Sequence, residues 1–272
     1  MRPRTLLLNL VLALGAVAVL LPFVWMLSLS VKPESEIYSP VVRLLPQHWD
    51  WANYAEAFAV GEVGTLILNG WIVTTAIVAL QFLTVIPAAY VLAREDFALK
   101  GTCFALVLAV LLIPPQVTAI PVYLMLGQAG LLNTRAALIL PFATSAFGLF
   151  LMRQSFRTVP QSLIDAARMD GAGEFRILWS IVVPQVYPAL AAFAVFSVVA
   201  HWNDFFWPLI AVTDLDKATP PLGIAMFASE EGGNDVGPMM ASATLIVMPL
   251  IAAFLLARKR FVEGISMTGL GG

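Results

Sequence analysis

The feature that most constrains this chain is a series of six long apolar blocks separated by shorter polar segments. The blocks cover residues 6–30, 65–93, 104–126, 136–152, 186–212 and 239–256. Each is close to the roughly 17–25 residues that a tilted helix needs to cross a bilayer. Hydrophobic residues make up 60% of the chain and charged residues 12%, far from the balance of a soluble domain. We therefore predict an all-α integral membrane protein, with six transmembrane helices in a single domain over residues 1–272.

The first block is either a cleaved signal peptide or a retained span. Arg2 and Arg4 precede it, as in a signal peptide. Its apolar part is longer than a signal h-region, however, and no small-x-small cleavage site follows it. We expect an uncleaved first span. Prolines inside or beside the later blocks predict kinks in them. These are Pro87, Pro114, Pro115, Pro121 and Pro249.

The basic residues predict the orientation. With a cytoplasmic N-terminus, eleven of the fifteen lie inside and four outside, in accord with the positive-inside rule. Those inside are Arg2, Arg4, Arg94, Lys100, Arg153, Arg157, Arg168, Arg176, Arg258, Lys259 and Arg260. Those outside are Lys32, Arg43, Arg135 and Lys217. Both termini and the polar segment 153–184 are therefore expected in the cytoplasm, beneath the cytoplasmic membrane of a prokaryote.

Segment 153–184 is the only long polar interval that itself reads as helices. Thr158 and Gln161 have capping-box spacing, and Pro160 suits a first helical turn, so a helix is predicted to begin here and to end at Gly171. A second helix follows, with an apolar stripe at helical spacing. The stripe consists of Phe175, Leu178, Trp179 and Val182. Such a hairpin suits docking into a groove of another protein.

The spacing within this hairpin carries a resemblance. Asp165-Ala166-Ala167, three residues, Gly171, nine residues and Ile181-x-Val183-Pro184 is similar to the EAA loop of ABC-transporter permeases, Glu-Ala-Ala-x3-Gly-x9-Ile-x-Leu-Pro. The resemblance implies the type I ABC importer permease fold, with the loop as a coupling helix seated in a cleft of a separate ATPase subunit. Asp for Glu and Val for Leu are the two departures. The alternative is an ordinary cytosolic hairpin between spans. The coupling residues would be Asp165, Ala166, Ala167, Arg168, Asp170, Gly171 and Phe175.

Further marks resemble the maltose-type, carbohydrate-importing branch of the same family. They are Asn53-Tyr54, Ala93-Arg94 with Phe97 and Gly101, and the tail at 259–264. The resemblance implies a second, homologous permease, two ATPase subunits that bind ATP and Mg²⁺, an extracytoplasmic solute-binding protein, and a sugar-like substrate. In that branch the C-terminal segment can reach the ATPase, so 258–272 is either a second contact or a basic anchor at the membrane surface.

Catalytic and metal-binding patterns are missing from the sequence. It contains no phosphate loop, no H-E-x-x-H and no G-x-S-x-G, so we predict a transport subunit that is not itself an enzyme and holds no cofactor. Cys103 is the single cysteine, and His48 and His201 are far apart, which leaves no metal-ligand pattern. A basic patch interleaved with aromatic residues is also missing, so a nucleic-acid partner is not expected.

The fifth block contains the best candidates for solute contact. His201, Trp202, Asn203 and Asp204 stand together in it and combine an aromatic face, an amide and a carboxylate, as sugar sites do. A charged group inside a membrane is costly unless it serves a function. The alternative is that the span ends near Asp204, which leaves the tryptophans in an interfacial belt. Gln116, Asn69 and Ser145 either line the solute path or join helices by hydrogen bonds.

The predicted function is import of a sugar or related polyol by alternating access. Two alternatives stay open. One is import of a sugar phosphate or glycerol phosphate by the same kind of complex. The other is a gradient-driven transporter with Asp204 as its titrating group.

Overall fold

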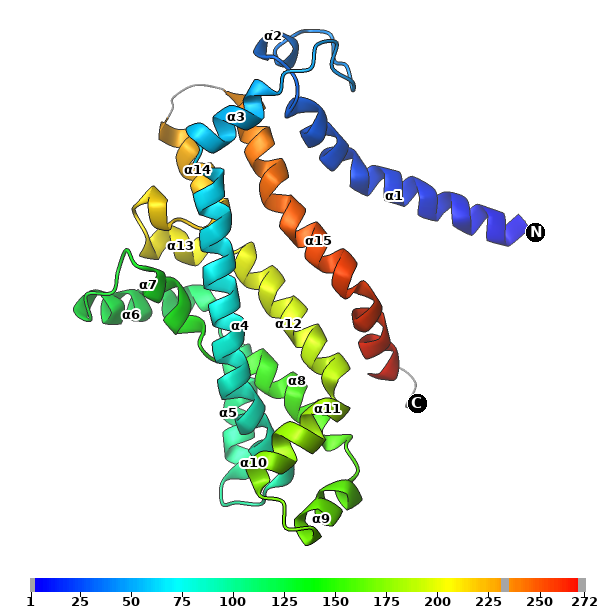
Figure 1. The fold of residues 1–272 in the computed structure, drawn as a ribbon, viewed down its shortest axis with the longest axis vertical. Helices are drawn as coiled ribbons and strands as arrows, with labels where there is room; N and C mark the ends of the chain where they lie inside the picture. Colours follow the sequence, from blue (N-terminus) through cyan, green and yellow to red (C-terminus); the bar gives the residue numbers. More distant parts are fainter. Residues whose placement is uncertain (1–2, 231–234, 269–272) are drawn as a thin grey trace. The chain divides into compact units, whose positions relative to one another are not determined.

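The computed structural model describes the backbone of residues 3–230 and 235–268, and every regular element in these ranges is a helix (Figure 1). The first half contains α1 Pro3–Leu29, α2 Glu34–Ile37, α3 Ala52–Ala59, α4 Val63–Arg94, α5 Lys100–Leu111, α6 Pro115–Gln128, α7 Arg135–Ile139 and η1 Leu140–Phe142. The second half contains α8 Ala146–Arg157, α9 Gln161–Met169, α10 Glu174–Ile177, η2 Leu178–Val182, α11 Val183–Gln185, α12 Tyr187–Trp202, α13 Phe206–Ala211, η3 Leu215–Lys217, α14 Pro220–Glu230 and α15 Val236–Thr268. The predicted all-α class is confirmed.

Several of these helices are long and apolar enough to cross a membrane. Three qualify singly, over Leu7–Leu29, Val63–Arg94 and Val236–Ala253. Three bent pairs qualify when each pair is taken as one span. The pairs are Lys100–Leu111 with Pro115–Gln128, Arg135–Phe142 with Ala146–Arg157, and Glu174–Gln185 with Tyr187–Trp202. By length and composition the described chain thus offers up to six spans, and the count of six stays a prediction.

The block predicted at 104–126 is not one straight helix. It divides into α5 and α6, which meet at 99°. Pro114 has extended backbone, with ψ 136°, and Pro115 occupies the first turn of α6. A proline disfavours helical geometry in the residue before it and cannot donate a backbone hydrogen bond, so two in succession end α5 and start a new helix. Pro87 and Pro121, in contrast, lie inside α4 and α6.

The block predicted at 186–212 is also interrupted. Helix α12 ends at Trp202, and the short α13 begins at Phe206. The Asn203 amide donates to the carbonyl of Val199 at 2.8 Å, in the last turn of α12. Polar residues therefore sit at the break between two helices, which is where freed backbone groups need partners.

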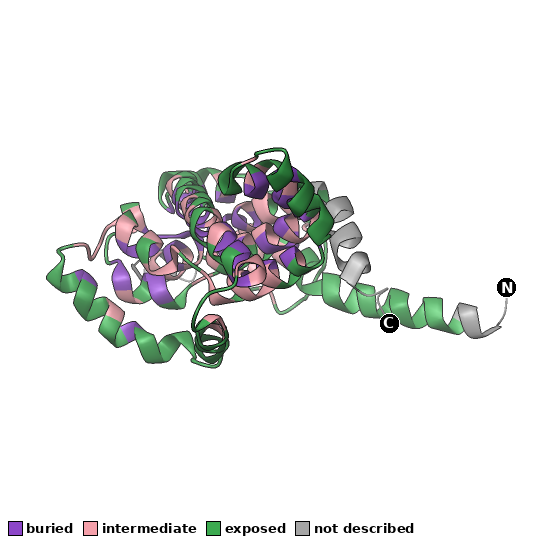
Figure 2. Ribbon diagram, turned by 90° about the horizontal axis from the view of Figure 1, so that it is seen from below, coloured by how far each residue is buried: buried purple, intermediate pink, exposed green. Residues whose placement is uncertain are grey.

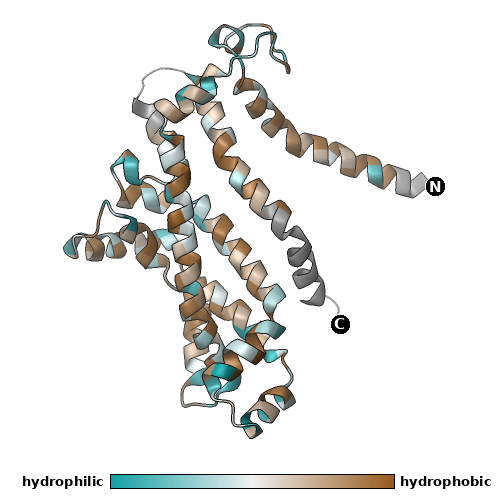
Figure 3. Ribbon diagram, viewed as in Figure 1, coloured by the Kyte–Doolittle hydropathy of each residue, from teal (hydrophilic) through white to brown (hydrophobic). Residues whose placement is uncertain are grey.

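The chain divides into two compact units. One consists of Met1–Ile67 with Pro220–Leu250. Its small core contains Ala57, Val63, Ala241 and Ile246. Helix α1 is exposed over residues 7–24 (Figure 2) and strongly hydrophobic (Figure 3). An apolar helix with no protein covering suits contact with lipid or with another membrane subunit.

The second unit consists of Leu68–Thr219 with Ile251–Gly272 and holds the larger core. Met152 and Phe156 on α8 are fully buried, together with Ile164 on α9 and Val182 in η2. Helix α8 packs against α12, where a Cβ on Gly148 would lie 2.4 Å from Cζ of Phe193. Only glycine permits this approach, as small residues do between membrane helices generally.

Candidate functional site

The polar hairpin is built around α9, whose two faces differ. Ile164 and Ala167 are buried in the core of the second unit. On the opposite side Leu163 is 41% exposed and Met169 84% exposed. An exposed apolar side chain beside a polar rim is typical of an interaction surface. Helix α9 thus anchors one face in its own unit and leaves the rest of its surface exposed.

The expected capping box is wrong, although α9 does begin at Gln161. Thr158 ends α8, and its hydroxyl donates to the Ser155 carbonyl at 2.8 Å, so it is not available to α9. The N-cap of α9 is Pro160, which offers no side-chain acceptor. The Gln161 amide instead donates to Oδ1 of Asp165 at 3.0 Å and accepts from Nη1 of Arg94 at 3.1 Å.

Gly171 ends the turn after α9 with φ +77°, in the left-handed region. A Cβ at this position would meet no atom within 4 Å, so the constraint lies in the backbone and not in crowding. Residues with a β-carbon adopt this conformation at a cost of roughly 1–2 kcal/mol. The glycine therefore sets the direction in which the chain leaves α9, as the sequence predicted.

The expected stripe on the second helix is only partly present. Leu178 and Val182 are buried and Trp179 is half-buried, but Phe175 is 79% exposed. Leu178–Val182 forms a π-helix, which has a wider turn than the α-helix assumed by the prediction. Phe175 lies before it, in the short α10, where its ring contacts Trp179 with centroids 6.2 Å apart and otherwise stays on the outer surface of the hairpin, as Met169 does.

The predicted coupling residues fall into two groups. Asp165, Ala166, Asp170, Gly171 and Phe175 are exposed, whereas Ala167 is buried in the core of its own unit. Arg168 is exposed, but its guanidinium turns back toward Glu95 beyond the end of α4.

Arg168 joins the hairpin to the end of α4. Its Nη2 lies 2.9 Å from Oε1 of Glu95, and its Nε lies 2.7 Å from Oε1 of Glu174. The hydroxyl of Tyr90 donates to the other oxygen of Glu174 at 3.0 Å. The bond from Arg168 holds the pKa of Glu174 below its usual value and raises the pKa of Arg168. Sequence reasoning missed Tyr90, Glu95 and Glu174, because no local pattern indicates partners this distant.

Arg94 makes a second connection between the same elements. Its Nη2 donates to the carbonyls of Phe156 and Val159, at the end of α8 and just beyond it. Its Nη1 donates to Gln161 at the start of α9. Burial lowers the pKa of Arg94. The end of α4 that is predicted to face the cytoplasm is therefore hydrogen-bonded both to the end of α8 and to the start of α9.

A cavity of about 310 Å³ lies elsewhere in the second unit, among α6, η1, α12 and α13. Its lining includes Gln116, Phe142, His201, Asp204 and Trp207. Oδ1 of Asp204 accepts from the backbone N–H of Trp207 at 3.3 Å, and the Trp207 indole donates to the carbonyl of Ala137 at 2.9 Å. Two predicted solute residues, Gln116 and Asp204, thus share one cavity, although 88 positions separate them.

The cavity also contains His201, which the sequence grouped with Asp204 among the candidate solute residues. Its Nε2 lies 3.3 Å from Nε2 of Gln81, which also donates to the Phe142 carbonyl at 3.1 Å. The hydroxyl of Ser197 donates to Oε1 of Gln81 at 2.7 Å. The structure thus gives this histidine a partner on α4 that the sequence could not indicate.

The remaining candidate solute residues lie outside this cavity. Trp202 is 1% exposed and packs edge-on against Trp71, with ring centroids 5.2 Å apart. Asn203 is exposed and caps α12. The Ser145 hydroxyl accepts from the N–H of Gly148 and caps α8. The structure thus gives these three side chains packing and capping contacts instead of a place in the cavity.

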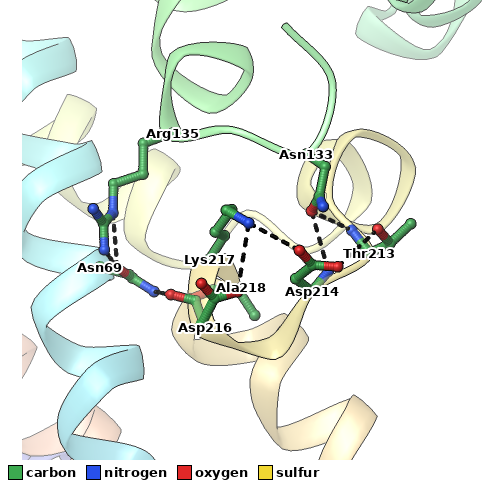
Figure 4. Close-up of polar contacts among 8 residues, drawn as sticks. All are labelled: Asn69, Asn133, Arg135, Thr213, Asp214, Asp216, Lys217 and Ala218. Atoms are coloured by element: carbon green, nitrogen blue, oxygen red, sulfur yellow. Dashed lines mark hydrogen bonds and ion pairs between the residues drawn. The ribbon is translucent and has the colours of Figure 1, made fainter.

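Asn69 has the second of the two roles that the sequence left open, a hydrogen bond that joins segments of the fold (Figure 4). It is fully buried, and its Nδ2 donates to the carbonyls of Asp216 at 2.8 Å and Ala218 at 3.0 Å. Its Oδ1 accepts from Nε and Nη2 of Arg135 at 3.0 and 2.8 Å. The amide therefore uses its whole hydrogen-bonding capacity to hold residues 216–218 against α4, and none is left for a solute.

Asn133 holds the other end of the same loop (Figure 4). Its Oδ1 accepts from the N–H groups of Thr213 and Asp214, both at 3.1 Å, while its own N–H donates to Ala211. Lys217 and Asp214 form an ion pair at 2.8 Å, which holds the pKa of the Asp214 carboxyl below its usual value. Residues 213–218 are thus fixed at both ends by asparagines.

Comparisons with known proteins agree with this arrangement. The family described as "Binding-protein-dependent transport system inner membrane component" matches residues 86–267. The diacetylchitobiose uptake system permease protein of Streptomyces coelicolor is 34% identical over 258 residues, covering 94% of this chain and 85% of the relative. The arabinooligosaccharides transport system permease protein of Halalkalibacterium halodurans is 30% identical, covering 92% of this chain and 91% of the relative.

Two further similarities concern a phosphorylated solute and the fold. The sn-glycerol-3-phosphate transport system permease protein of Yersinia pestis is 29% identical over 264 residues, with 94% of each chain covered. Among solved structures, a bacterial ABC transporter involved in the import of the acidic polysaccharide alginate matches with a TM-score of 0.87 at 23% identity. That match covers 96% of this chain and 97% of the other, and it shows the type I importer permease fold.

Proposed function

The chain belongs to the family of inner membrane components of binding-protein-dependent transport systems, and we propose that it imports a sugar or related polyol as one permease subunit of an ATP-driven transporter. The observation that carries this proposal is the family match over residues 86–267, together with relatives whose names specify oligosaccharide uptake. As a family member it is a multi-pass membrane protein that works with an ATPase and a solute-binding protein. It is not itself an enzyme.

The complex would contain a second, similar permease and two ATPase subunits, which would bind the ATP and Mg²⁺. Both termini and the α9 hairpin would face the cytoplasm, in line with the distribution of basic residues. The exposed helix α1 supports a membrane partner, since it leaves an apolar surface uncovered. The side chains of the C-terminal tail, 258–272, lie outside the described residues, so a tail contact with the ATPase rests on the sequence resemblance alone.

The α9 hairpin would be the coupling element. Exposed Met169 and Phe175 would enter a cleft of the ATPase, beside the exposed Asp165. Closure of the ATPase dimer on ATP would move α9, and the connections through Arg168 and Arg94 would pass that movement to α4. Such a loop must bind the two states of the ATPase with different affinity, because equal affinity would shift no equilibrium.

The glycerol-phosphate relative supports a second candidate solute, a phosphorylated one. A gradient-driven transporter with Asp204 as its titrating group is no longer favoured, because family membership couples this chain to an ATPase.

The test is ATP hydrolysis by the reconstituted complex with its ATPase, second permease and binding protein, across sugars, polyols and their phosphates. We expect stimulation by one neutral sugar and ATP-dependent uptake of it. Failure of the chain to co-purify with any ATPase, or uptake that persists without ATP and collapses with the ion gradient, would reject the proposal.

A further inference from the structure

We propose that the cavity beside Asp204 binds an uncharged, hydroxyl-bearing ring, with His201 as a hydrogen-bond donor that Gln81 fixes in one tautomer, and that it disfavours phosphorylated solutes. This inference rests on the proposed function. It assigns His201 a donor role with a fixed tautomer and commits the cavity to one charge class.

The Gln81 side chain is 3% exposed, and its hydrogen bond to a backbone carbonyl sets the orientation of its amide. A backbone carbonyl only accepts hydrogen bonds, so the atom of Gln81 that lies 3.1 Å from the Phe142 oxygen must be the NH₂ nitrogen. The amide oxygen then faces Ser197, whose hydroxyl donates to it at 2.7 Å in a buried contact. The Phe142 carbonyl therefore sets the orientation of the amide, and the Ser197 hydroxyl, which can donate or accept, is compatible with it.

The contact with Gln81 decides which nitrogen of the His201 ring carries the proton. The same Gln81 nitrogen lies 3.3 Å from Nε2 of His201, and an amide NH₂ group donates without accepting. Nε2 must therefore offer its lone pair, which places the ring proton on Nδ1. An imidazolium would set one N–H group against another, so this contact favours the neutral ring. Among the described residues none accepts from Nδ1, and His201 lines the cavity, so the donor is available to a solute.

The charge of the residues that line the cavity favours an uncharged solute over a phosphorylated one. Asp204 and His201 are the only ionisable residues among those that line the cavity, and no lysine or arginine joins them. The Asp204 carboxylate accepts from the backbone N–H groups of Trp207 and Phe206, and its two oxygens have further lone pairs for a solute hydroxyl. A sugar hydroxyl both donates and accepts, so it can bond Asp204 and His201 alike. A phosphate only accepts at neutral pH, and it would meet a carboxylate with no cation in compensation.

The size of the cavity and the aromatic side chains in its lining suit a sugar ring. A volume of about 310 Å³ is at the lower end for small-molecule sites, which suits one sugar ring at a time. Phe142 and Trp207 supply aromatic surface beside the polar groups, and their rings meet edge-on with centroids 6.5 Å apart. The cavity thus pairs apolar walls with one donor and one acceptor.

The first experiment measures solute binding to the complex of both permeases and the ATPase, without the binding protein, whose own selectivity would otherwise dominate. Saturation-transfer NMR with diacetylchitobiose and with sn-glycerol-3-phosphate, each at millimolar concentration, reports contact directly. We expect the sugar to bind at least about tenfold more strongly than the phosphate. His201→Phe keeps a ring but removes the donor, and Asp204→Asn removes the charge. The first should weaken sugar binding, and the second should reduce the discrimination against phosphate.

The second experiment reads the tautomer and would not respond to a merely structural role. His48→Gln leaves His201 as the only histidine of this chain, so ¹⁵N-histidine labelling of this chain within the complex gives a single ring to assign. We expect protonated Nδ1 and unprotonated Nε2 at pH 7. Gln81→Met should produce a mixture of tautomers, whereas Gln128→Met, the same replacement at an exposed position of α6, should leave the spectrum unchanged.

Several results would overturn the inference. They are preferred binding of the phosphate, no saturation transfer from either probe, sugar binding that His201→Phe and Asp204→Asn leave intact, and an Nε2–H ring or an imidazolium at pH 7. These results leave the proposed function in place if the complex still hydrolyses ATP in response to a loaded binding protein. Loss of ATPase association would instead reject the proposed function, whatever the cavity binds.

Discussion

Arg168 of α9 and Glu95 at the end of α4 are 73 positions apart in the chain, yet Nη2 of one lies 2.9 Å from Oε1 of the other. The same guanidinium binds Glu174 through Nε at 2.7 Å. A single side chain thereby joins the two helices of the hairpin to a helix of the membrane domain. If the ATPase acts on α9, the contacts of Arg168 would pass the movement of α9 to α4.

We expect Arg168→Gln to lower the amount of solute imported per ATP hydrolysed. The exposed ion pairs stabilise the junction by only about 1 kcal/mol, so the expected fall is about fivefold, with the complex still assembled. Uptake and hydrolysis measured on the same proteoliposomes give the ratio. Lys100→Gln, which removes an exposed ion pair with Asp96 at the start of α5, is the matched control. An unchanged ratio in Arg168→Gln would remove the junction from the coupling route.

Replacement of Gly171 should act through the backbone. Because φ is +77° and a Cβ would have open space, Gly171→Asn should retain more solute-stimulated hydrolysis than Gly171→Val, since asparagine tolerates the left-handed region. Gly173→Val is the matched control, because Gly173 has φ −73° and equally open space. Equal loss in all three variants would point to crowding against a partner instead of strain.

Gly148→Ala should destabilise the second unit. The new Cβ would lie 2.4 Å from the Phe193 ring, and overpacking of this kind costs about 1–3 kcal/mol. Thermal unfolding of the detergent-solubilised complex measures the loss. Phe193→Leu added to Gly148→Ala should recover part of it, because a smaller side chain frees the space. A double variant less stable than Gly148→Ala alone would contradict this explanation.

Asn69→Ala should loosen residues 213–218 while leaving sugar binding in the cavity unchanged. The substitution leaves the carbonyls of Asp216 and Ala218 and the Arg135 guanidinium without their partner, at a cost of about 1–3 kcal/mol. Hydrogen exchange of the backbone amides at 213–218 should become faster. If exchange stays slow and solute binding falls instead, then Asn69 lies on the solute path, as the sequence alone suggested.

The ion pair between Arg168 and Glu174 should be lost at low pH. The pKa of Glu174 is lowered in the folded state, mainly by its bond from Arg168, so this carboxylate stabilises the fold above the ordinary glutamate value of about 4.3. That contribution is lost as the pH falls through the lowered pKa. Hydrogen exchange of α9 and α10 should therefore accelerate in that range and less so in Glu174→Gln. A pH-independent difference between the two proteins would contradict the assignment.

Local sequence signals predicted the features that depend on a few neighbouring residues. The helix end before Gly171, a helix start close to Pro160 and a departure from a straight helix at Pro114 are of this kind. The capping box failed because Thr158 lies where α8 ends, and its hydroxyl is already used there. Periodicity could not reveal the π-helix at Leu178–Val182, because the pattern assumed 3.6 residues per turn.

Contacts between distant parts of the chain set the limit of the sequence reading. Asn69 reads as a polar residue inside a span, and only the fold shows that residues 147 and 149 positions away occupy its amide. His201 and Gln116 likewise become neighbours only when α6 and α12 meet at the cavity. A polar residue in an apolar block thus indicates that it has a partner, but not which one.

The π-helix at Leu178–Val182 lets the hairpin absorb a change in chain length. A π turn closes its hydrogen bond one residue later than an α turn, so it completes about the same rotation with about one residue more. Removal of a single residue from this wide turn, with the α-helical register restored, would therefore leave Phe175 facing nearly the same way relative to Val183. Among relatives, a length change of one residue here would be expected to leave the shape of the groove that receives the hairpin unchanged.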